Sequence, residues 1–270
     1  MILKRQAEIE LMAEAAVVNR EALESIEPHI KPGATTAQLN RIAEKAIRSR
    51  GGRPAFKGYR GSSDAVVPFP GVLCTSVNDI VVHGIPDNKP LREGDVLSVD
   101  IGTFYKGYAA DMAKTYRVGR VSPEAQQLLD VTERSLYAGI EAAQAGNRLG
   151  DVSAAIQDVV EAAGFWVVRE FVGHGIGSSF HEGPDVPNYG RAGTGPRLRP
   201  GLVLAIEPMV TQRETTVSIL QDGWTAPTAD GSLSAHFEHT VAITADGPRI
   251  LTAHNQAPRA LVAEGGAYGA

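Results

Sequence analysis

The sequence predicts an α+β fold made of two similar halves, each with two helices followed by strands. Helical and β-branched stretches alternate in the order helix, helix, sheet, and this order occurs twice. A ten-residue pattern, Leu91 to Asp100, returns at Leu198 to Glu207. No linker composition separates the halves. We therefore expect one domain over residues 1–260, with halves of about 1–120 and 121–260 and a flexible glycine-rich tail at 261–270.

The first half begins with two helices and continues with strands. Apolar residues recur at helical spacing from Ile2 to Val17, and residues 32–52 then supply a cap, a periodic stretch and a glycine stop. Between Val66 and Tyr116 the chain changes to β-branched runs separated by Gly, Pro and Asn-Asp. Such runs are typical of strands and hairpins.

The second half repeats this order. Ser122 is placed to cap a helix over residues 122–144, a further helix is predicted over 149–164, and strands resume afterwards. The pattern LRxGxVL occurs in both halves and leads in each to a carboxylate, Asp100 or Glu207. Chance similarity is the alternative, but the number of matching positions favours equivalent strands of two halves related by a pseudo-twofold axis.

Composition indicates a globular protein and gives no reason to expect a polyanionic partner. The 270 residues are 43% hydrophobic, and 26 basic against 31 acidic residues give a net charge of −5 without a block of like charges. The first twenty residues mix charged with apolar side chains, which argues against export and against a membrane span. We expect a cytoplasmic protein, and the single cysteine, Cys74, fits a reducing compartment.

Two aspartates are predicted to meet on one face of a hairpin. Asp100 begins the stretch DIGTFYKGYAAD, which ends at Asp111. A turn at Lys106-Gly107 would place Asp111 opposite Gly102 and diagonal to Asp100. The two carboxylates could then approach a common point, with glycine leaving the space.

Glu207 ends the second copy of the repeated pattern, and Glu238 lies in SAHFEHTVAIT, which is expected to form one strand. Four carboxylates are therefore expected in apolar strand surroundings. Buried ionised groups are costly unless they are paired or bound to metal, and two divalent cations would balance this set. Imidazoles are available from His174 and His181, in a segment whose glycines exclude a helix. Carboxylates with one imidazole suit Mn, Fe, Co or Zn, and ions roughly 3.5 to 4 Å apart can assist hydrolysis.

Five stretches of the chain resemble the motifs of type I methionine aminopeptidases of the pita-bread metallopeptidase family, in the family's order and spacing. They are SVNDIVVHGIP, SVDIGTFYKGYAADMAKTY, GHGIGSSFHEGPDVPNY, IEPMV and FEHTVAIT. The resemblance runs from about Leu3 to Thr252. It implies the pita-bread (creatinase/aminopeptidase) fold, two pseudo-twofold-related halves around a central antiparallel sheet. The chain resembles the short bacterial form, because it shows no Cys/His-rich N-terminal extension and no long insertion between His181 and Glu207.

The resemblance also implies a reaction and its ligands. The reaction is hydrolytic removal of the initiator methionine from nascent polypeptides, with a small second residue preferred. Two divalent ions per chain, Co, Mn, Fe or Zn, would assist it, with Asp111 and Glu238 bridging them. The implied ligands are Asp100, Asp111, His174, Glu207 and Glu238.

Catalytic roles follow from the same resemblance. Glu207 would accept a proton, His181 would donate a hydrogen bond to the scissile carbonyl, and His83 would contact the scissile amide nitrogen. A lone histidine in a strand is more often a packed residue, but the glycine-rich setting of His181 and the motif match favour catalysis. The remaining histidines are interpreted as structural or surface residues: His29, His236, His239 and His254.

An unbranched thioether requires an apolar pocket. Phe69, Cys74, Phe180 and Trp224 occupy or lie near positions where similar proteins build it. Aromatic residues in strands are usually core residues, so each also has a structural interpretation. Residues 57–73 and 188–201 depart from the family pattern, which leaves the rim of the pocket undefined.

Two other functions are alternatives to methionine removal. A proline-specific relative would share fold and ligands but usually carries an additional N-terminal domain. A silent binding module for RNA or protein would lose ligands or gain basic tails, whereas all five ligand residues and both histidines are present. The expected partners are nascent peptides and the ribosome near its exit tunnel. We expect no binding to a specific nucleic-acid sequence or to a membrane, and we expect the protein to be a monomer.

Overall fold

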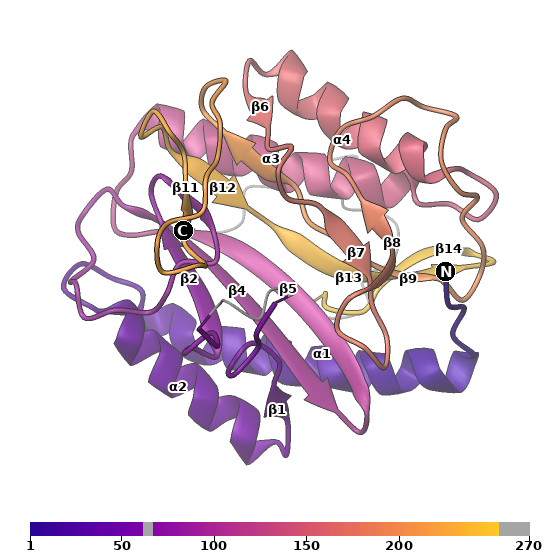
Figure 1. Ribbon diagram of the computed structural model, residues 1–270, viewed down its shortest axis with the longest axis horizontal. Helices are drawn as coiled ribbons and strands as arrows, with labels where there is room; N and C mark the ends of the chain where they lie inside the picture. Colours follow the sequence, from indigo (N-terminus) through magenta and orange to yellow (C-terminus); the bar gives the residue numbers. More distant parts are fainter. Residues whose placement is uncertain (62–66, 254–270) are drawn as a thin grey trace.

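The protein contains two helix pairs, and strands follow each pair in the sequence. The structure is a computed structural model that describes residues 1–61 and 67–253 (Figure 1). The predicted tail at 261–270 and His254 therefore lie outside the described residues. The helices are α1 (Gln6–Ile26), the short 3-10 helix η1 (Glu27–His29), α2 (Thr36–Ser49), α3 (Pro123–Ala142) and α4 (Leu149–Ala162).

The strands fall into the two groups that the sequence predicts. Those of the first half are β1 (Arg53–Pro54), β2 (Leu73–Val77), β3 (Ile80–Val82), β4 (Val96–Tyr105) and β5 (Tyr108–Arg117). Those of the second half are β6 (Trp166–Val167), β7 (Gly173–Gly175), β8 (Glu182–Val186), β9 (Val203–Ile206), β10 (Met209–Thr211), β11 (Ala226–Pro227), β12 (Ser234–His236), β13 (Glu238–Thr244) and β14 (Gly247–Ile250).

Local signals begin α2 and α3 where the sequence predicts, whereas α1 begins at Gln6, after the Ile2 at which the predicted periodicity starts. The Thr35 hydroxyl accepts a hydrogen bond from the Gln38 amide at the start of α2, and the Gln38 side chain accepts one from the Thr35 amide in return. Ser122 caps α3 by accepting from the Ala125 amide at 3.1 Å. These caps satisfy backbone donors that have no partner within the helix.

The main sheet is antiparallel and shows the symmetry of the repeat. Its strand order is β1-β4-β5-β13-β9-β7-β8, with β2 also paired to β4 and β14 to β13. The two copies of the repeated pattern become β4 and β9, and each lies one strand away from the central pair β5 and β13. Equivalent strands therefore occupy equivalent places on the two sides of the centre, as the sequence predicts.

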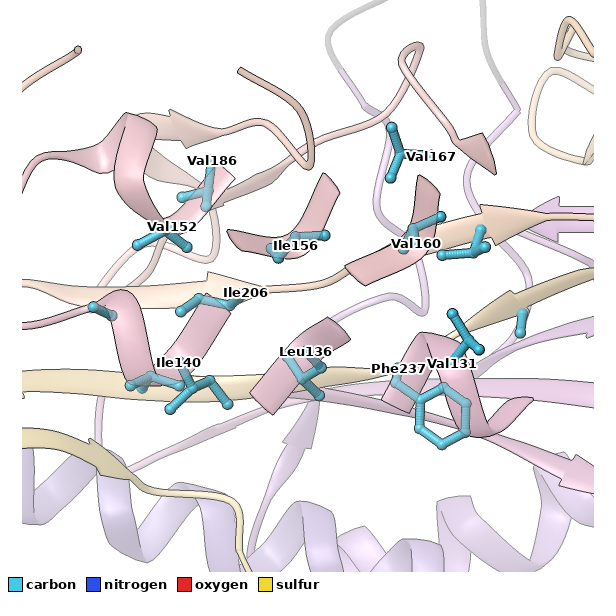
Figure 2. Close-up of a cluster of buried hydrophobic side chains, with 14 of the residues drawn as sticks. Val131, Leu136, Ile140, Val152, Ile156, Val160, Val167, Val186, Ile206 and Phe237 are labelled. Atoms are coloured by element: carbon cyan, nitrogen blue, oxygen red, sulfur yellow. The ribbon is translucent and has the colours of Figure 1, made fainter. Parts of the chain in front are cut away.

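All four α-helices pack on one face of this sheet. Leu97, Val99 and Ile101 of β4 belong to a buried cluster with α1 and α2. Ile206 and Val241, from β9 and β13, belong to a second cluster with α3 and α4 (Figure 2). Because side chains alternate along a strand, the intervening residues face away from the helices. The carboxylates lie on this second face.

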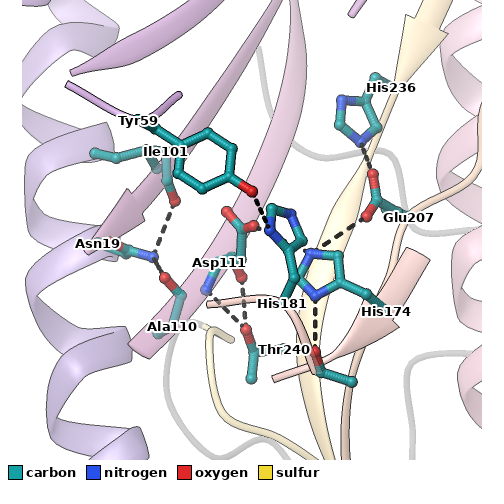
Figure 3. Close-up of polar contacts among 11 residues, drawn as sticks. Asn19, Tyr59, Ile101, Ala110, Asp111, His174, His181, Glu207, His236 and Thr240 are labelled. Atoms are coloured by element: carbon teal, nitrogen blue, oxygen red, sulfur yellow. Dashed lines mark hydrogen bonds and ion pairs between the residues drawn. The ribbon is translucent and has the colours of Figure 1, made fainter. Parts of the chain in front are cut away.

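A buried polar contact joins α1 to the first hairpin. The Asn19 side chain is fully buried and donates to the carbonyls of Ile101 at 3.0 Å and Ala110 at 2.8 Å (Figure 3). In the described residues, no helix has both the length and the apolar character needed to cross a membrane.

The predicted hairpin turn is confirmed. Tyr105 pairs with Tyr108, and the two residues between them, Lys106 and Gly107, have φ of 49° and 84°. Positive φ at both central residues fits a tight two-residue hairpin turn. Asp111 consequently pairs with Gly102, the register that the sequence predicts.

One strand prediction needs correction. The stretch SAHFEHTVAIT reads as one strand but forms two, because the chain changes sheets at Phe237. Residues up to His236 pair with β10, whereas Glu238 begins β13 beside β5. The alternation of side chains continues through this change, so periodicity alone does not reveal it.

Candidate metal centre

The five predicted ligands come from five strands of the main sheet. Strand β4 carries Asp100, β5 carries Asp111, β7 carries His174, Glu207 directly follows β9, and Glu238 begins β13. These strands are neighbours in the order β4-β5-β13-β9-β7. The site therefore lies across the centre of the sheet, and both halves contribute to it.

Register explains why the acidic side chains converge. Ala113 of β5 pairs with Asp100 on one side and with Glu238 on the other. Paired residues project to the same face, so the two carboxylates flank a small methyl group. Asp111 lies two residues before Ala113 and projects to this face as well.

Asp111, His174 and Glu238 form a compact group. One potential ligand atom from each lies within 4.8 Å of the others, and all three residues are buried. Nε2 of His174 is 3.7 Å from Oδ2 of Asp111 and 3.8 Å from Oε1 of Glu207. Asp100 and Glu207 thus adjoin a three-residue group that a cation could join.

A hydrogen bond fixes the ring of His174. Its Nδ1 lies 2.9 Å from the carbonyl oxygen of Gly175, which can only accept. Nδ1 therefore carries the proton, and a neutral ring leaves the lone pair of Nε2 free on the side of Asp111 and Glu207. This is the arrangement of a metal-ligating histidine.

The buried carboxyl groups resist ionisation without a counter-charge. Burial raises the pKa of Asp100, Asp111 and Glu238 well above their ordinary values, and the neighbouring carboxylates raise the pKa values further. One buried oxygen of each, Asp100 Oδ1, Asp111 Oδ1 and Glu238 Oε1, has no hydrogen-bond partner. Divalent cations would supply both the charge and the partners that these oxygens lack, so the donor set fits a metal site.

Backbone contacts hold two of the acidic residues. The Thr240 hydroxyl donates to the Asp111 carbonyl at 2.7 Å and accepts from the Asp111 amide at 2.9 Å, which ties β5 to β13 at the site. The side-chain amide of Asn188 donates to the Glu207 carbonyl at 3.0 Å. Such contacts orient ligands before a cation binds.

His83 and His181 line a cavity beside these ligands. The cavity has a volume of about 460 Å³, and His174, Glu207 and Met209 also line it. His83 follows β3 with φ of 60°, a rare conformation outside glycine. Burial lowers the pKa of His83 to about 4 despite the opposing effect of Glu207.

His181 lies at the exposed side of this cavity. Its ring centroid is 4.3 Å from that of His174, and its Nδ1 is hydrogen-bonded to the Tyr59 hydroxyl at 3.0 Å (Figure 3). Loss of contact with water and the adjacent His174 lower the pKa of His181 to about 4. Both histidines are therefore neutral near pH 7 and can each donate one ring N–H.

The four predicted pocket residues lie in two groups joined by a phenylalanine. Phe69, Cys74 and Trp224 form one buried cluster. Phe56 joins it to Phe180, with ring centroids 6.4 Å from Phe69 and 5.5 Å from Phe180. The result is a continuous group of apolar side chains, which we call the apolar wall. The four predicted pocket residues are not among those that line the cavity of about 460 Å³.

Glycine at position 102 makes room for part of this wall. A Cβ atom on Gly102 would lie 2.5 Å from the Phe180 ring and 3.0 Å from Phe56. The space opposite Asp111 is therefore filled by Phe180, not left open. Burial raises the pKa of the Cys74 thiol, so the thiol stays protonated and is a poor nucleophile.

Sequence reasoning missed two residues of the site. His236 is buried, and its Nε2 lies 3.3 Å from Oε2 of Glu207, so Glu207 lies between His236 and His174 (Figure 3). Its position two residues before Glu238 was the available signal. Tyr59 lies in the stretch that departs from the family pattern, of which residues 62–66 are outside the described part.

Family comparison agrees with this donor set. The model of metallopeptidase family M24 matches residues 10–245. The chain belongs to this family. An M24 metallopeptidase is a metal-using hydrolase, and the cluster of Asp111, His174 and Glu238 supports the use of divalent metal.

Curated relatives of this M24 chain span nearly its whole length. It is 50% identical over 252 residues to a methionine aminopeptidase of Clostridium perfringens, covering 93% of this chain and 98% of the relative. It is 48% identical over 252 residues to methionine aminopeptidase 1 of Bacillus subtilis, covering 93% and 99%.

Solved structures confirm the pita-bread fold. Methionine aminopeptidase from Thermotoga maritima matches with a TM-score of 0.90 at 44% identity, covering 94% of this chain and all of that one. Prolidase from Pyrococcus furiosus matches with a TM-score of 0.72 at 20% identity, covering 94% of this chain and 66% of that one. The second similarity concerns the fold alone.

Proposed function

We propose that this protein removes N-terminal methionine from peptides by hydrolysis assisted by two divalent ions. The observation that carries the proposal is the convergence of Asp111, His174 and Glu238, whose potential ligand atoms lie within 4.8 Å of one another. This group adjoins a cavity lined by His83 and His181. The names of the most similar relatives support methionine as the residue removed.

Five residues would hold the ions. They are Asp100, Asp111, His174, Glu207 and Glu238. Two bound divalent ions supply positive charge that lowers the pKa of water and polarises a carbonyl group. Co, Mn, Fe and Zn all suit these donors, and the metal that the cell supplies decides which is bound.

The side chains around the ligands would guide the proton and the substrate. Glu207 would take a proton from the attacking water and pass it toward the leaving amine. Neutral His181 would donate its ring N–H to the scissile carbonyl as negative charge develops on the oxygen. Neutral His83, which lines the same cavity, would contact the scissile amide nitrogen.

The apolar wall would select the side chain. Phe69, Cys74, Phe180 and Trp224 offer aromatic and sulfur surfaces that an unbranched thioether can contact without losing a hydrogen bond. A small second residue would be preferred, since the metal ligands and His83 crowd the position next to the scissile bond. Nascent peptides in the cytoplasm are the proposed substrates, with a monomeric enzyme that meets them near the ribosomal exit tunnel.

Hydrolysis of Met-Ala-Ser tests the proposal. The protein is first treated with a chelator and then titrated with Mn²⁺, Fe²⁺ or Co²⁺, and free methionine is measured. We expect no release after chelation and recovery with at least one metal. A parallel Ala-Pro peptide separates methionine removal from proline-specific cleavage. A folded, metal-binding protein that releases nothing from Met-Ala-Ser would overturn the proposal.

A further inference from the structure

An ion pair is buried at the start of the chain. The ammonium group of Lys4 is bonded to Oε2 of Glu182, and both side chains are only 4% exposed. Lysine and glutamate are rarely buried to this extent, because removing two charges from water is costly. Charged side chains usually keep a protein surface soluble, but a buried pair cannot do so. We therefore expect this pair to have another role.

The pair connects the N-terminal segment to the loop of His181. Lys4 lies just before α1 in the first half of the chain, whereas Glu182 directly follows His181 in the second half. The Lys4 amide donates to the Gly201 carbonyl at 2.7 Å, shortly before β9. Lys4 therefore joins both segments of the second half that carry proposed catalytic side chains, the one with His181 and the one leading to Glu207.

The loop before Glu182 is built around the ion pair. The Ser179 amide donates to Oε1 of Glu182 at 3.4 Å. A Cβ atom on Gly177 would lie 2.4 Å from both Oε1 of Glu182 and Cε of Lys4, so a larger residue cannot occupy this position without displacing the pair. The Gly177 carbonyl is held by the Ala109 amide at 2.8 Å.

His181 itself has few anchors. It lies between the end of β7 and the start of β8, where no regular hydrogen-bond ladder fixes the backbone, and its side chain is exposed. The hydrogen bond between its Nδ1 and the Tyr59 hydroxyl orients the imidazole but does not fix the backbone. The backbone position at 181 depends instead on its neighbour Glu182, which pairs with Gly175 at the start of β8 and whose side chain is held by Lys4.

We propose that Lys4 is a positioning residue for His181, acting through Glu182 to hold the catalytic imidazole against the scissile carbonyl. The inference rests on the proposed peptidase function. Neither Lys4 nor Glu182 touches the substrate in this proposal. Their effect on the reaction must therefore pass through His181.

A double-mutant cycle tests this dependence. Lys4→Met removes the charge and keeps much of the side-chain volume. We expect it to lower kcat for Met-Ala-Ser roughly 10- to 100-fold with little change in KM, because a displaced hydrogen-bond donor weakens transition-state contacts most. In a His181→Ala background the same substitution should lower kcat less than about threefold. Equal losses in both backgrounds would overturn the inference.

Controls separate positioning from folding. Lys106→Met removes a lysine whose ion pair with Glu14 is half exposed, and it should leave kcat unchanged. Lys4→Met leaves the buried Glu182 unpaired, so Lys4→Met/Glu182→Gln removes both charges and should unfold near the wild-type temperature while keeping the kcat defect. Wild-type kcat in that folded double variant, or failure of both variants to fold, would contradict a positioning role.

A spectroscopic measurement is independent of turnover. In zinc-loaded protein with ¹⁵N-labelled histidine, Lys4→Met should shift or broaden the ring signals of His181, identified by their loss in His181→Ala. The signals of surface His29 should not move. Unchanged His181 signals would overturn the inference. Absence of methionine release from the wild type, with any metal, would instead overturn the proposed function.

Discussion

At the scale of single residues, the site is a set of buried carboxyl groups that can ionise readily only beside a positive charge. Asp111 is the clearest case: it is 4% exposed, one of its oxygens has no hydrogen-bond partner, and other carboxylates surround it. Replacing Asp111 with asparagine removes a carboxyl group from the site with almost no change in side-chain volume. Its substitution therefore separates metal binding from folding.

Asp111→Asn should lower turnover roughly 100-fold or more and weaken metal uptake, because an amide is a neutral and poorer metal ligand. The metal-free variant should unfold at or above the wild-type temperature near pH 7, since one source of repulsion is gone. Metal titration calorimetry and thermal unfolding measure the two effects. Asp158→Asn, on the exposed face of α4, is the matched control. Full activity in Asp111→Asn would refute the dinuclear site.

His83 gives a prediction about pH. Its folded pKa of about 4 lies below the ordinary value of 6.5, so the unfolded chain takes up this proton first as pH falls. The contribution of neutral His83 to stability is complete above about pH 6.5 and is lost progressively between 6.5 and 4. Denaturant unfolding across this range should show a steeper loss for the wild type than for His83→Gln. Parallel curves of stability against pH for the two proteins would contradict a lowered pKa of His83.

At the scale of elements, the strands that carry the site depend on small residues at close contacts. Gly102 on β4 lies against the Phe180 ring, so the hairpin and the loop of the second half can approach only without a side chain there. This contact joins the hairpin that carries two of the proposed metal ligands to the apolar wall.

Gly102→Ala should destabilise the protein by about 1–3 kcal/mol through overpacking. It should also raise KM for methionyl peptides, because Phe180 must move. Phe180→Leu in combination should recover part of the stability, giving a coupling that unfolding measurements can resolve. Strictly additive effects of the two substitutions would show that the contact between Gly102 and Phe180 carries no strain.

The sequence predicted helix starts and hairpin turns well, because these features depend on residues close together in the chain. The Thr35 and Ser122 caps and the Lys106-Gly107 turn each act within a few residues, and the structure has them where the sequence predicts. The change of sheet at Phe237 and the contact of His236 with Glu207 depend on strands far apart in the chain. No local pattern specifies them, so sequence reasoning joined β12 to β13 and left His236 among the structural residues.

At the scale of the whole molecule, the repeat predicted the position of the site better than any single motif. Equivalent strands from the two halves flank the central pair of the sheet and carry Asp100, inside β4, and Glu207, directly after β9, to the same region. The roles of individual ligands, the expected single domain over 1–260 and the monomeric state stay predictions.

The two halves share little backbone pairing at the centre of the sheet. Only Glu238 and His239 of β13 are in register with β5, whereas β4 and β5 pair along their full length. Ions held by Asp111 and Glu238 would join the two strands. Chelation should therefore speed amide hydrogen exchange at β13 and at Met112 and Ala113, in the middle of β5, more than in the rest of the β4–β5 hairpin. Equal acceleration throughout would refute this.

The central position of β5 and β13 also bears on how such a chain could arise. Each half supplies one helix pair and carboxylates at two adjacent strands, so two copies of a half-length chain related by a twofold axis could form a similar cluster. Joining the copies in one gene lets the halves differ. In this chain the first half keeps an aspartate pair, whereas the second supplies glutamates and the only imidazole of the proposed ligand set.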